Sequence, residues 1–431
     1  MRDKLKRCIL FVLAVLLTAN LFTNITNSLI LSFLIIVSQL LCLRKEDSAI
    51  VFMLMGSFWG SFYAQEGVRF IGSILIWGST LLMIKDLLNY KNNWLSSFFP
   101  LVLFILVVLV SIVSTTGGNY SVDKFTSMLI NTIVYTIAFS HLSLYKDKHT
   151  FPNIGFMFVL YSLFLLGYMN ELINTKASLE TLLYSFAGLR YEINDYIAGD
   201  KDIWHVNYQD IGMHACLGMV FTLFTNNGNA KKNKLYIVVL TFLVVWYAAA
   251  RQAILLYVLI LFAYFALYQG LKLKSVILIT ILILGCNALL SSLDNQSLDF
   301  LLGSTEGKDS ARNNIMNMAM TQFHAKPVFG VGFGRFYYQG EYGCNEHNLF
   351  VELLTEMGVF GLLIFMYSCL KPLINSYSYI KKNIKEVSVF LLVLLSYFVR
   401  SMVSSDLRET IIVLIIILCI NMIRKYNIQL I

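Results

Sequence analysis

Charged residues and proline are both scarce in this chain. Only 13% of its 431 residues are Asp, Glu, Lys or Arg, whereas soluble domains average about 25%. The four prolines argue against long linkers or disordered segments. Most of the seven cysteines lie in apolar runs, and we expect only Cys344 clearly outside them, so the sequence predicts neither a disulfide framework nor a cysteine metal cluster.

Apolar runs of membrane-spanning length fill the chain instead, and 58% of the residues are hydrophobic. Because backbone groups in lipid must bond internally, such runs predict helices. We therefore expect an all-α polytopic membrane protein, residues 1–431 forming one integral membrane domain with about 12–14 transmembrane helices. The runs lie at 8–22, 26–43, 48–64, 68–84, 95–113, 125–144, 151–169, 208–225, 235–250, 252–270, 273–291, 358–374, 387–403 and 408–423.

Basic residues predict the orientation of these spans. If the basic N-terminus is cytoplasmic, the loops alternate so that most lysines fall inside, as the positive-inside rule requires. The first run lacks a convincing cleavage site, so we interpret it as an uncleaved span and expect both termini in the cytoplasm. Two long outer segments, 170–207 and 292–357, are predicted as extracytoplasmic loops containing short helices.

Arginine is distributed differently from lysine. The outer side receives seven arginines: Arg69, Arg190, Arg251, Arg312, Arg335, Arg400 and Arg408. Arginine binds phosphate in bidentate fashion, so this enrichment on an acidic outer face favours specific anion contacts. Snorkelling to the membrane interface explains any single arginine equally well.

The first outer loop, 170–207, is acidic and aromatic. Tyr191, Tyr196 and Trp204 suit stacking on sugar rings, and they suit an interfacial aromatic belt equally. Asp200-Lys-Asp202 has the form of a metal-binding motif but is a weak signal alone, and we predict no metal site. Nothing indicates a nucleic-acid partner.

The second outer loop, 292–357, predicts a short amphipathic helix. Ser310 is a suitable N-cap, and an apolar stripe follows at Ile315, Met316, Ala319, Met320 and Phe323. Arg312 shares the side of this stripe, where a charge needs a partner. That partner is either Glu306 or Asp309, or an anionic ligand.

The segment Asn345-Glu-His-Asn348 carries the strongest chemical signal. With Asn345 as N-cap, Glu346, His347 and Asn348 would occupy the first helical turn, and Gly358 would mark either a break or a close packing point. The positive end of the helix dipole disfavours imidazolium and favours anions. A neutral His347 there suits a general base, although a structural histidine is the alternative.

A glycine loop, Gly330-Val-Gly-Phe-Gly334, precedes this segment. Its backbone N–H groups, including those of Gly332 and Gly334, could bind an oxyanion, and Arg335 adds a donor fork. No strand–helix unit surrounds the loop, so it is not a dinucleotide fingerprint.

Four features of the second outer loop and the following span together resemble the signature of the O-antigen ligase / Wzy polymerase superfamily. They are Arg312, Pro327-Val-Phe-Gly-Val-Gly-Phe-Gly334, His347-Asn348 and Glu356-Met-Gly-Val-Phe-Gly361. Arg251, in Tyr247-Ala-Ala-Ala-Arg-Gln252, resembles that family's other arginine. The resemblance implies inverting, metal-independent glycosyl transfer without a cofactor, on the outer face of the bacterial plasma (inner) membrane. It implies a polyprenyl-pyrophosphate-linked oligosaccharide as donor.

The resemblance suggests roles for individual residues. We expect His347 to be the base and Arg251 and Arg312 to stabilise the departing diphosphate, with Arg335, Arg190, Gly332 and Gly334 binding substrate. Asn348 or Glu346 would orient either the imidazole or the acceptor. A polymerase of lipid-linked O-antigen or capsule repeat units is our first interpretation, and a ligase moving finished polymer to lipid A-core is the alternative. Membrane lipids, a chain-length regulator and a flippase are the expected partners. A transporter would instead predict charges along the middle of its spans.

Overall fold

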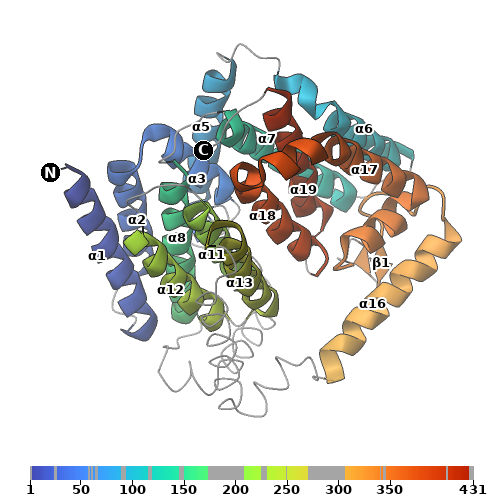
Figure 1. Cartoon of the computed structure of the whole chain (residues 1–431). Coiled ribbons are helices and arrows are strands. Elements are labelled where there is room, and N and C mark those ends of the chain that lie inside the picture. The colour runs from blue at the N-terminus through green and yellow to red at the C-terminus, as the bar shows by residue number, and fades with distance from the viewer. Residues whose placement is uncertain are drawn as a thin grey trace. The chain divides into compact units, whose positions relative to one another are not determined.

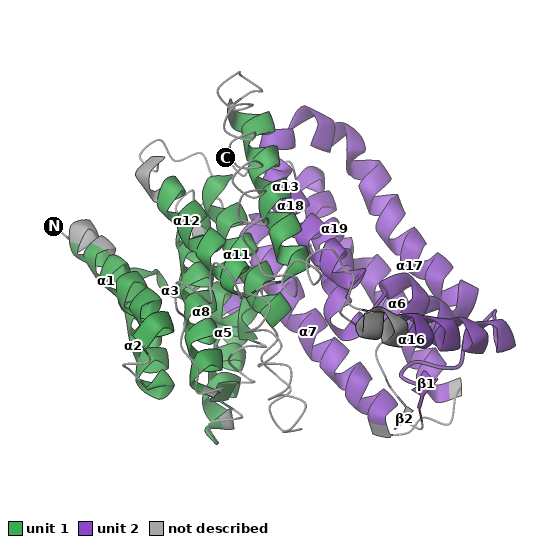
Figure 2. Cartoon of the chain, turned by 90° about the horizontal axis from the view of Figure 1, so that it is seen from below, with its two compact units in different colours: residues 1–82, 147–304 green, residues 83–146, 305–431 purple. Residues whose placement is uncertain are grey.

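The computed structural model is built almost entirely from helices (Figure 1). It describes residues 2–23, 27–56, 59, 62–63, 67–88, 94–114, 119–144, 150–172, 208–224, 231–248, 250–269, 306–339, 341–342, 346–403 and 406–426. Among these residues are 14 α-helices, which confirms the expected all-α membrane architecture. Residues 1–82 and 147–304 form unit 1, and residues 83–146 and 305–431 form unit 2 (Figure 2).

Unit 1 is centred on the contact between α8 and α11. A Cβ added to Gly155 would lie 2.4 Å from the Gly218 carbonyl oxygen, so glycine at both positions lets these helix backbones approach. The elements are α1 (Arg2–Thr23), α2 (Ser28–Cys42), α3 (Lys45–Leu54), most of α5 (Arg69–Leu88), α8 (Thr150–Leu172), α11 (Tyr208–Leu223), α12 (Lys231–Tyr247), α13 (Arg251–Tyr264) and the π-helix η3 (Phe265–Gln269).

Unit 2 is built around α19, which packs against α7, α17 and α18. Its residues from Thr410 to Ile420 are all buried, as an apolar helix enclosed by other helices requires. The elements are η1 (Trp94–Phe98), α6 (Phe99–Ser114), α7 (Asn119–Leu144), α16 (Glu306–Ala325), β1 (Tyr337–Tyr338), β2 (Glu341–Tyr342), α17 (Leu349–Lys382), α18 (Ile384–Ser401) and α19 (Leu407–Lys425).

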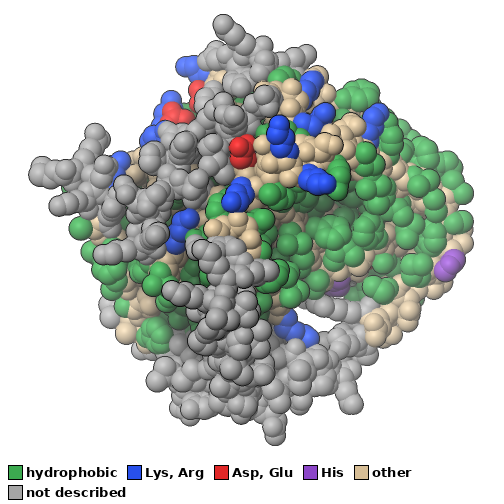
Figure 3. Space-filling model, viewed as in Figure 1, with side chains coloured by type: hydrophobic (Ala, Val, Ile, Leu, Met, Phe, Trp, Pro, Cys, Tyr) green, Lys and Arg blue, Asp and Glu red, His purple; other side chains and the backbone are tan. Residues whose placement is uncertain are grey.

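The predicted spans agree with these helices. Each predicted span except 273–291 overlaps an α-helix, and 273–291 lies outside the described residues. Within the part of the chain that is described, six helices are long and apolar enough to cross a membrane. On the side where α6 and α17 lie, the surface is largely hydrophobic (Figure 3), as expected of a lipid-facing surface. Val113 of α6 and Ile374 of α17 are among the exposed large hydrophobic residues of the described chain.

Two local predictions were wrong. Helix α16 begins at Glu306, so Ser310 lies inside the helix and is not its N-cap. Met316 is exposed although the apolar stripe predicted its burial, whereas Ala319 is fully buried where α16 packs against α17. A small residue at the contact lets α16 lie close to α17, so only part of the stripe is covered.

Candidate functional site

The break in α17 at Gly358 organises the candidate site. Gly358 has φ 67° and ψ −170°, which confirms the predicted interruption and divides α17 into two segments. Thr355 and Glu356, at the end of the first segment, accept backbone hydrogen bonds from Val331 (2.8 Å) and Gly332 (2.9 Å). A helix end leaves backbone groups without intrahelical partners, and the glycine loop therefore satisfies these carbonyls.

The same loop serves the second segment of α17. Val359 N–H donates to the Pro327 carbonyl (2.9 Å), and Phe360 N–H donates to the Val328 carbonyl (3.1 Å). This approach requires glycine: a Cβ on Gly330 would lie 2.4 Å from the Glu356 carbonyl carbon, and one on Gly358 would lie 2.3 Å from the Val328 oxygen. Both glycines also have positive φ, which other residues rarely adopt.

Most backbone N–H groups of the glycine loop are bonded within the protein, so those of residues 330–333 are not open to an oxyanion. Beyond the bonds of Val331 and Gly332, Phe333 N–H donates to Ser111 Oγ (3.0 Å). The N–H groups of residues 330 and 335 bond to carbonyls within residues 326–332. In an apolar environment the carbonyls at a helix break need hydrogen-bond donors from the protein, and N–H groups of the loop supply them.

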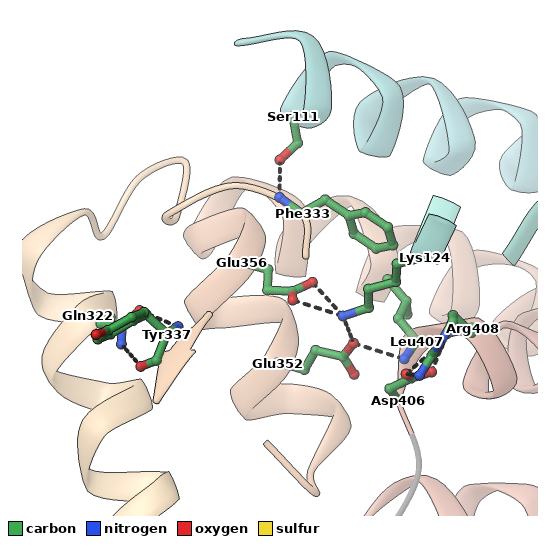
Figure 4. A network of polar contacts seen from close by, with 10 residues as sticks. All are labelled: Ser111, Lys124, Gln322, Phe333, Tyr337, Glu352, Glu356, Asp406, Leu407 and Arg408. Carbon is green, nitrogen blue, oxygen red and sulfur yellow. Dashed lines mark hydrogen bonds and ion pairs between the residues drawn. The ribbon is translucent and has the colours of Figure 1, made fainter. Parts of the chain in front are cut away.

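A buried ion cluster lies beside the helix break (Figure 4). Lys124 Nζ, from α7, donates to Glu352 Oε1 at 2.6 Å and to the two carboxylate oxygens of Glu356 at 2.8 and 2.9 Å. All three side chains are at most 2% exposed. The ammonium also lies 4.9 Å from the centre of the Phe333 ring, in a cation–π contact. The cluster thus joins α7, α17 and the glycine loop.

The start of α19 joins the same network. Glu352 Oε1 accepts the Leu407 N–H at 2.9 Å, so one carboxylate oxygen bonds both Lys124 and the first turn of α19. Asp406 caps α19 through the Arg408 N–H and pairs with the Arg408 guanidinium. The carboxylate of Asp406 is favoured at the N-terminus of α19 by the helix dipole, and its ion pair keeps Arg408 next to the cluster.

The chain around His347 differs from the prediction. The N-cap of α17 is Asn348, whose Oδ1 accepts the N–H groups of Phe350 (3.0 Å) and Val351 (3.2 Å), and Asn345 is not the cap. His347 lies before the helix with φ 57°, in the left-handed region. Asparagine satisfies two orphan N–H groups at 348, which shifts the helix start to Leu349. His347 thus remains near the positive helix end without belonging to its first turn.

Glu346 is buried beside this turn and is 2% exposed. Burial raises the pKa of its carboxyl well above the usual range, the carboxylates of Glu356 and Glu352 raise it further, and Lys124 opposes them. A buried carboxyl surrounded by like charges favours its neutral form.

The three carboxylates have the spacing of a possible cation site. Oxygens of Glu346, Glu352 and Glu356 lie within 4.8 Å of one another, close enough to surround a hard cation. Lys124 Nζ already donates to two of the three, however. A lysine ammonium thus occupies the position that a metal would need between Glu352 and Glu356.

The other predicted site residues are distributed over both units. Arg335 follows the glycine loop and is partly buried. Arg251, in unit 1, is the exposed first residue of α13. The backbone of Arg312 lies in α16, but its side chain is outside the described part of the chain. The first three residues of the predicted loop 170–207 belong to the end of α8. Residues 173–207, with Arg190 and the Asp200-Lys-Asp202 motif, lie outside the described residues.

Sequence reasoning missed Lys124, Glu352 and Asp406. A usable signal was present for Glu352 and Glu356, which are four residues apart on one helical face in a strongly apolar region. Buried charges in such regions are costly and mark functional or structural networks. Lys124 lies 228 residues from Glu352 in the chain, so the sequence offered no means of pairing them.

Comparison with known families confirms the resemblance. Residues 236–366 match the family described as O-antigen ligase. The matched segment begins in α12, includes Arg251 and α16, and ends just after the Gly358 break in α17. No curated protein matches the chain.

Removing the ammonium should destabilise unit 2. Lys124→Met leaves buried carboxylates without their cation, a change that costs about 3–5 kcal/mol in comparable buried pairs. We expect a lower midpoint of thermal unfolding in detergent micelles. Lys371→Met, an exposed lysine of α17, is the matched control and should change stability by less than about 0.5 kcal/mol. Equal unfolding midpoints for both variants would contradict a structural role for the cluster.

Gly358→Ala should also be destabilising. An alanine there combines a strained backbone region, which costs about 1–3 kcal/mol, with a clash against the Val328 carbonyl. Gly78→Ala in α5 is the control, because its Cβ would meet nothing within 4 Å. We expect the control to be neutral or slightly stabilising in the same unfolding measurement. A Gly358→Ala protein as stable as wild type would show that the break does not need glycine.

Proposed function

We propose that this protein, which carries an O-antigen ligase domain over residues 236–366, polymerises lipid-linked oligosaccharide repeat units of O-antigen or capsule. It transfers the growing glycan from polyprenyl pyrophosphate to a hydroxyl of the incoming lipid-linked unit, with inversion and without a metal. The reaction takes place on the outer face of the bacterial plasma membrane, with both termini in the cytoplasm. The observation that carries the proposal is the family match, together with the position of His347 before the capped N-terminus of α17.

The chemistry requires two tasks. Polyprenyl pyrophosphate is a good leaving group, so its departing charge needs stabilisation and the acceptor hydroxyl needs a base. Guanidinium groups suit the first task, and we assign it to Arg251 and Arg312, with Arg335 and Arg190 as additional anion contacts. We assign His347 as the base that takes the acceptor proton while the hydroxyl oxygen attacks the anomeric carbon.

Asn348 supports this assignment for His347. Its Oδ1 holds the first turn of α17, and its Nδ2 donates to the Met402 carbonyl at 3.4 Å. The residue following the proposed base is thereby bonded both to its own helix and to the end of α18. Such support keeps a catalytic side chain in one geometry. A flippase and a chain-length regulator are the proposed partners in the membrane.

A ligase is the second candidate, favoured by the description of the matched family. It would move completed polymer from the lipid carrier to lipid A-core or another acceptor. Both reactions break the same bond to pyrophosphate and need the same base, so they differ in the acceptor alone.

Loss of the proposed base or of an arginine should abolish transfer. His347→Ala should lower polymer formation by at least about 100-fold, the usual scale for a general base. Arg312→Ala should lower it strongly, and Arg251→Lys should also be impaired because a point charge does not reproduce the guanidinium fork. The measurement is complementation of a polymer-deficient strain at equal protein level. His324→Ala, an exposed histidine of α16, is the control and should retain polymer. Normal polymer with both His347→Ala and Arg312→Ala would refute the assignment.

The glycan phenotype of a deletion strain separates the two candidates. Without a polymerase, the acceptor carries at most one repeat unit, because no chain grows. Without a ligase, long polymer accumulates on its lipid carrier. We expect the first phenotype, resolved by gel electrophoresis of acceptor-linked and carrier-linked glycan. The second phenotype would contradict the assignment as a polymerase and support the assignment as a ligase.

A further inference from the structure

The buried cluster contains more negative than positive groups. Oxygens of three carboxylates lie within 4.8 Å of one another, those of Glu346, Glu352 and Glu356. The Lys124 ammonium donates hydrogen bonds to two of them, Glu352 and Glu356. Asp406 and Arg408 are the nearest further charges on α19, and they pair with each other. Full ionisation would leave two uncompensated negative charges among these buried side chains, which is strongly unfavourable, and a proton on one carboxyl reduces that imbalance.

The hydrogen bonds indicate which carboxyl is not compensated. Glu356 accepts from Lys124 through both carboxylate oxygens, and Glu352 accepts from Lys124 and from Leu407 N–H. Neither carboxylate oxygen of Glu346 has a hydrogen-bond partner in another residue of the described chain. Glu346 is as buried as the other two, so it is the carboxyl least able to remain ionised.

We propose that Glu346 carries a proton in the working protein, and that in this neutral form it is a positioning residue for His347. This inference rests on the proposed function only in taking His347 as the base. It assigns Glu346 no contact with substrate, and of the two roles expected from sequence, orienting the imidazole or the acceptor, it keeps the first and assigns it to the neutral carboxyl.

The backbone connects the protonation state of Glu346 to the position of His347. Glu346 is directly followed by His347, whose φ of 57° is uncommon for a residue other than glycine, and then by the N-cap Asn348. An uncommon conformation persists when its flanks are held firmly. Asn348 holds one flank through α17, and the buried Glu346 side chain holds the other. An ionised Glu346 would be drawn toward water, and its departure would release the turn.

Stability and activity should both decrease at alkaline pH, as Glu346 loses its proton. The pKa of Glu346 is raised well above the ordinary carboxyl value of 4.5, so the folded protein holds a proton that the unfolded chain releases above that value. The stabilisation from neutral Glu346 is complete below about pH 4.5 and is lost as pH rises through the raised pKa. The groups facing Glu346 are Lys124 from α7 and Glu352 and Glu356 from α17. Activity should therefore fall on the alkaline side as Glu346 loses its proton.

The test uses Glu346→Gln, which keeps the shape of the neutral carboxyl and cannot ionise. Full-length wild type, Glu346→Gln and Glu346→Ala are reconstituted in lipid nanodiscs with a lipid-linked oligosaccharide, and kcat and KM are measured across pH. We expect Glu346→Gln within about 3-fold of wild type at neutral pH, with its alkaline limb shifted to higher pH. Glu346→Ala should lose at least about 10-fold in kcat with KM little changed, because the flank of the turn is no longer packed. Glu386→Gln, on α18 away from the cluster, is the matched control and should follow the wild-type profile.

Infrared spectroscopy provides a readout that does not depend on glycan transfer. Wild type at neutral pH should show the carbonyl band of a protonated carboxylic acid, and Glu346→Gln should lack it. A more than 10-fold loss of activity in stably folded Glu346→Gln, or an unchanged acid band, would overturn the inference. Activation of wild type by Mn²⁺ that Glu346→Gln abolishes would also overturn it, because a bound cation would then supply the missing charge. An inactive wild type that still shows the acid band would count against the proposed function alone.

Discussion

The interaction on which unit 2 depends is the set of hydrogen bonds made by the Lys124 ammonium. Its bonds to Glu352 and Glu356 connect α7 to the first segment of α17, and Glu352 extends the connection to the first turn of α19. Burying these charges is costly, so the arrangement is stable only while each keeps its partner. The ion cluster therefore specifies one relative placement of three helices that hydrophobic packing alone would allow to slide.

The glycine loop solves a related problem in the backbone. A helix interrupted at Gly358 exposes carbonyls on one side of the break and N–H groups on the other, and an apolar environment offers no water to satisfy them. Residues 327–332 bond to both sides. The glycines that resemble a ligand-binding loop in sequence therefore close the break, and Phe333 connects the loop to the ion cluster because the Lys124 ammonium lies over its ring. Together the two networks position the short turn that carries Glu346, His347 and Asn348.

Much of this architecture could be predicted. Apolar runs of the right length predicted the helices, and the glycine at 358 predicted the break, because both are properties of a local segment. The predicted start of α17 was three residues too early, since Asn345 and Asn348 are equally good caps locally. The glycine loop shows a comparable limit of sequence: free N–H groups and bonded ones look the same there, and only the docking of residues 327–332 on α17 shows that those of Val331 and Gly332 are bonded.

The sequence by itself determined that this is a helical membrane protein and that the region from Arg312 to Gly361 carries the family signature, because hydropathy and motif spacing are written along the chain. The tertiary structure alone decided which charges meet. Lys124 and Glu352 are separated by 228 residues, and no local pattern encodes a contact between them. Burial then changes what those residues are chemically, since in a site without water the balance of carboxylates and ammonium groups determines where a proton remains.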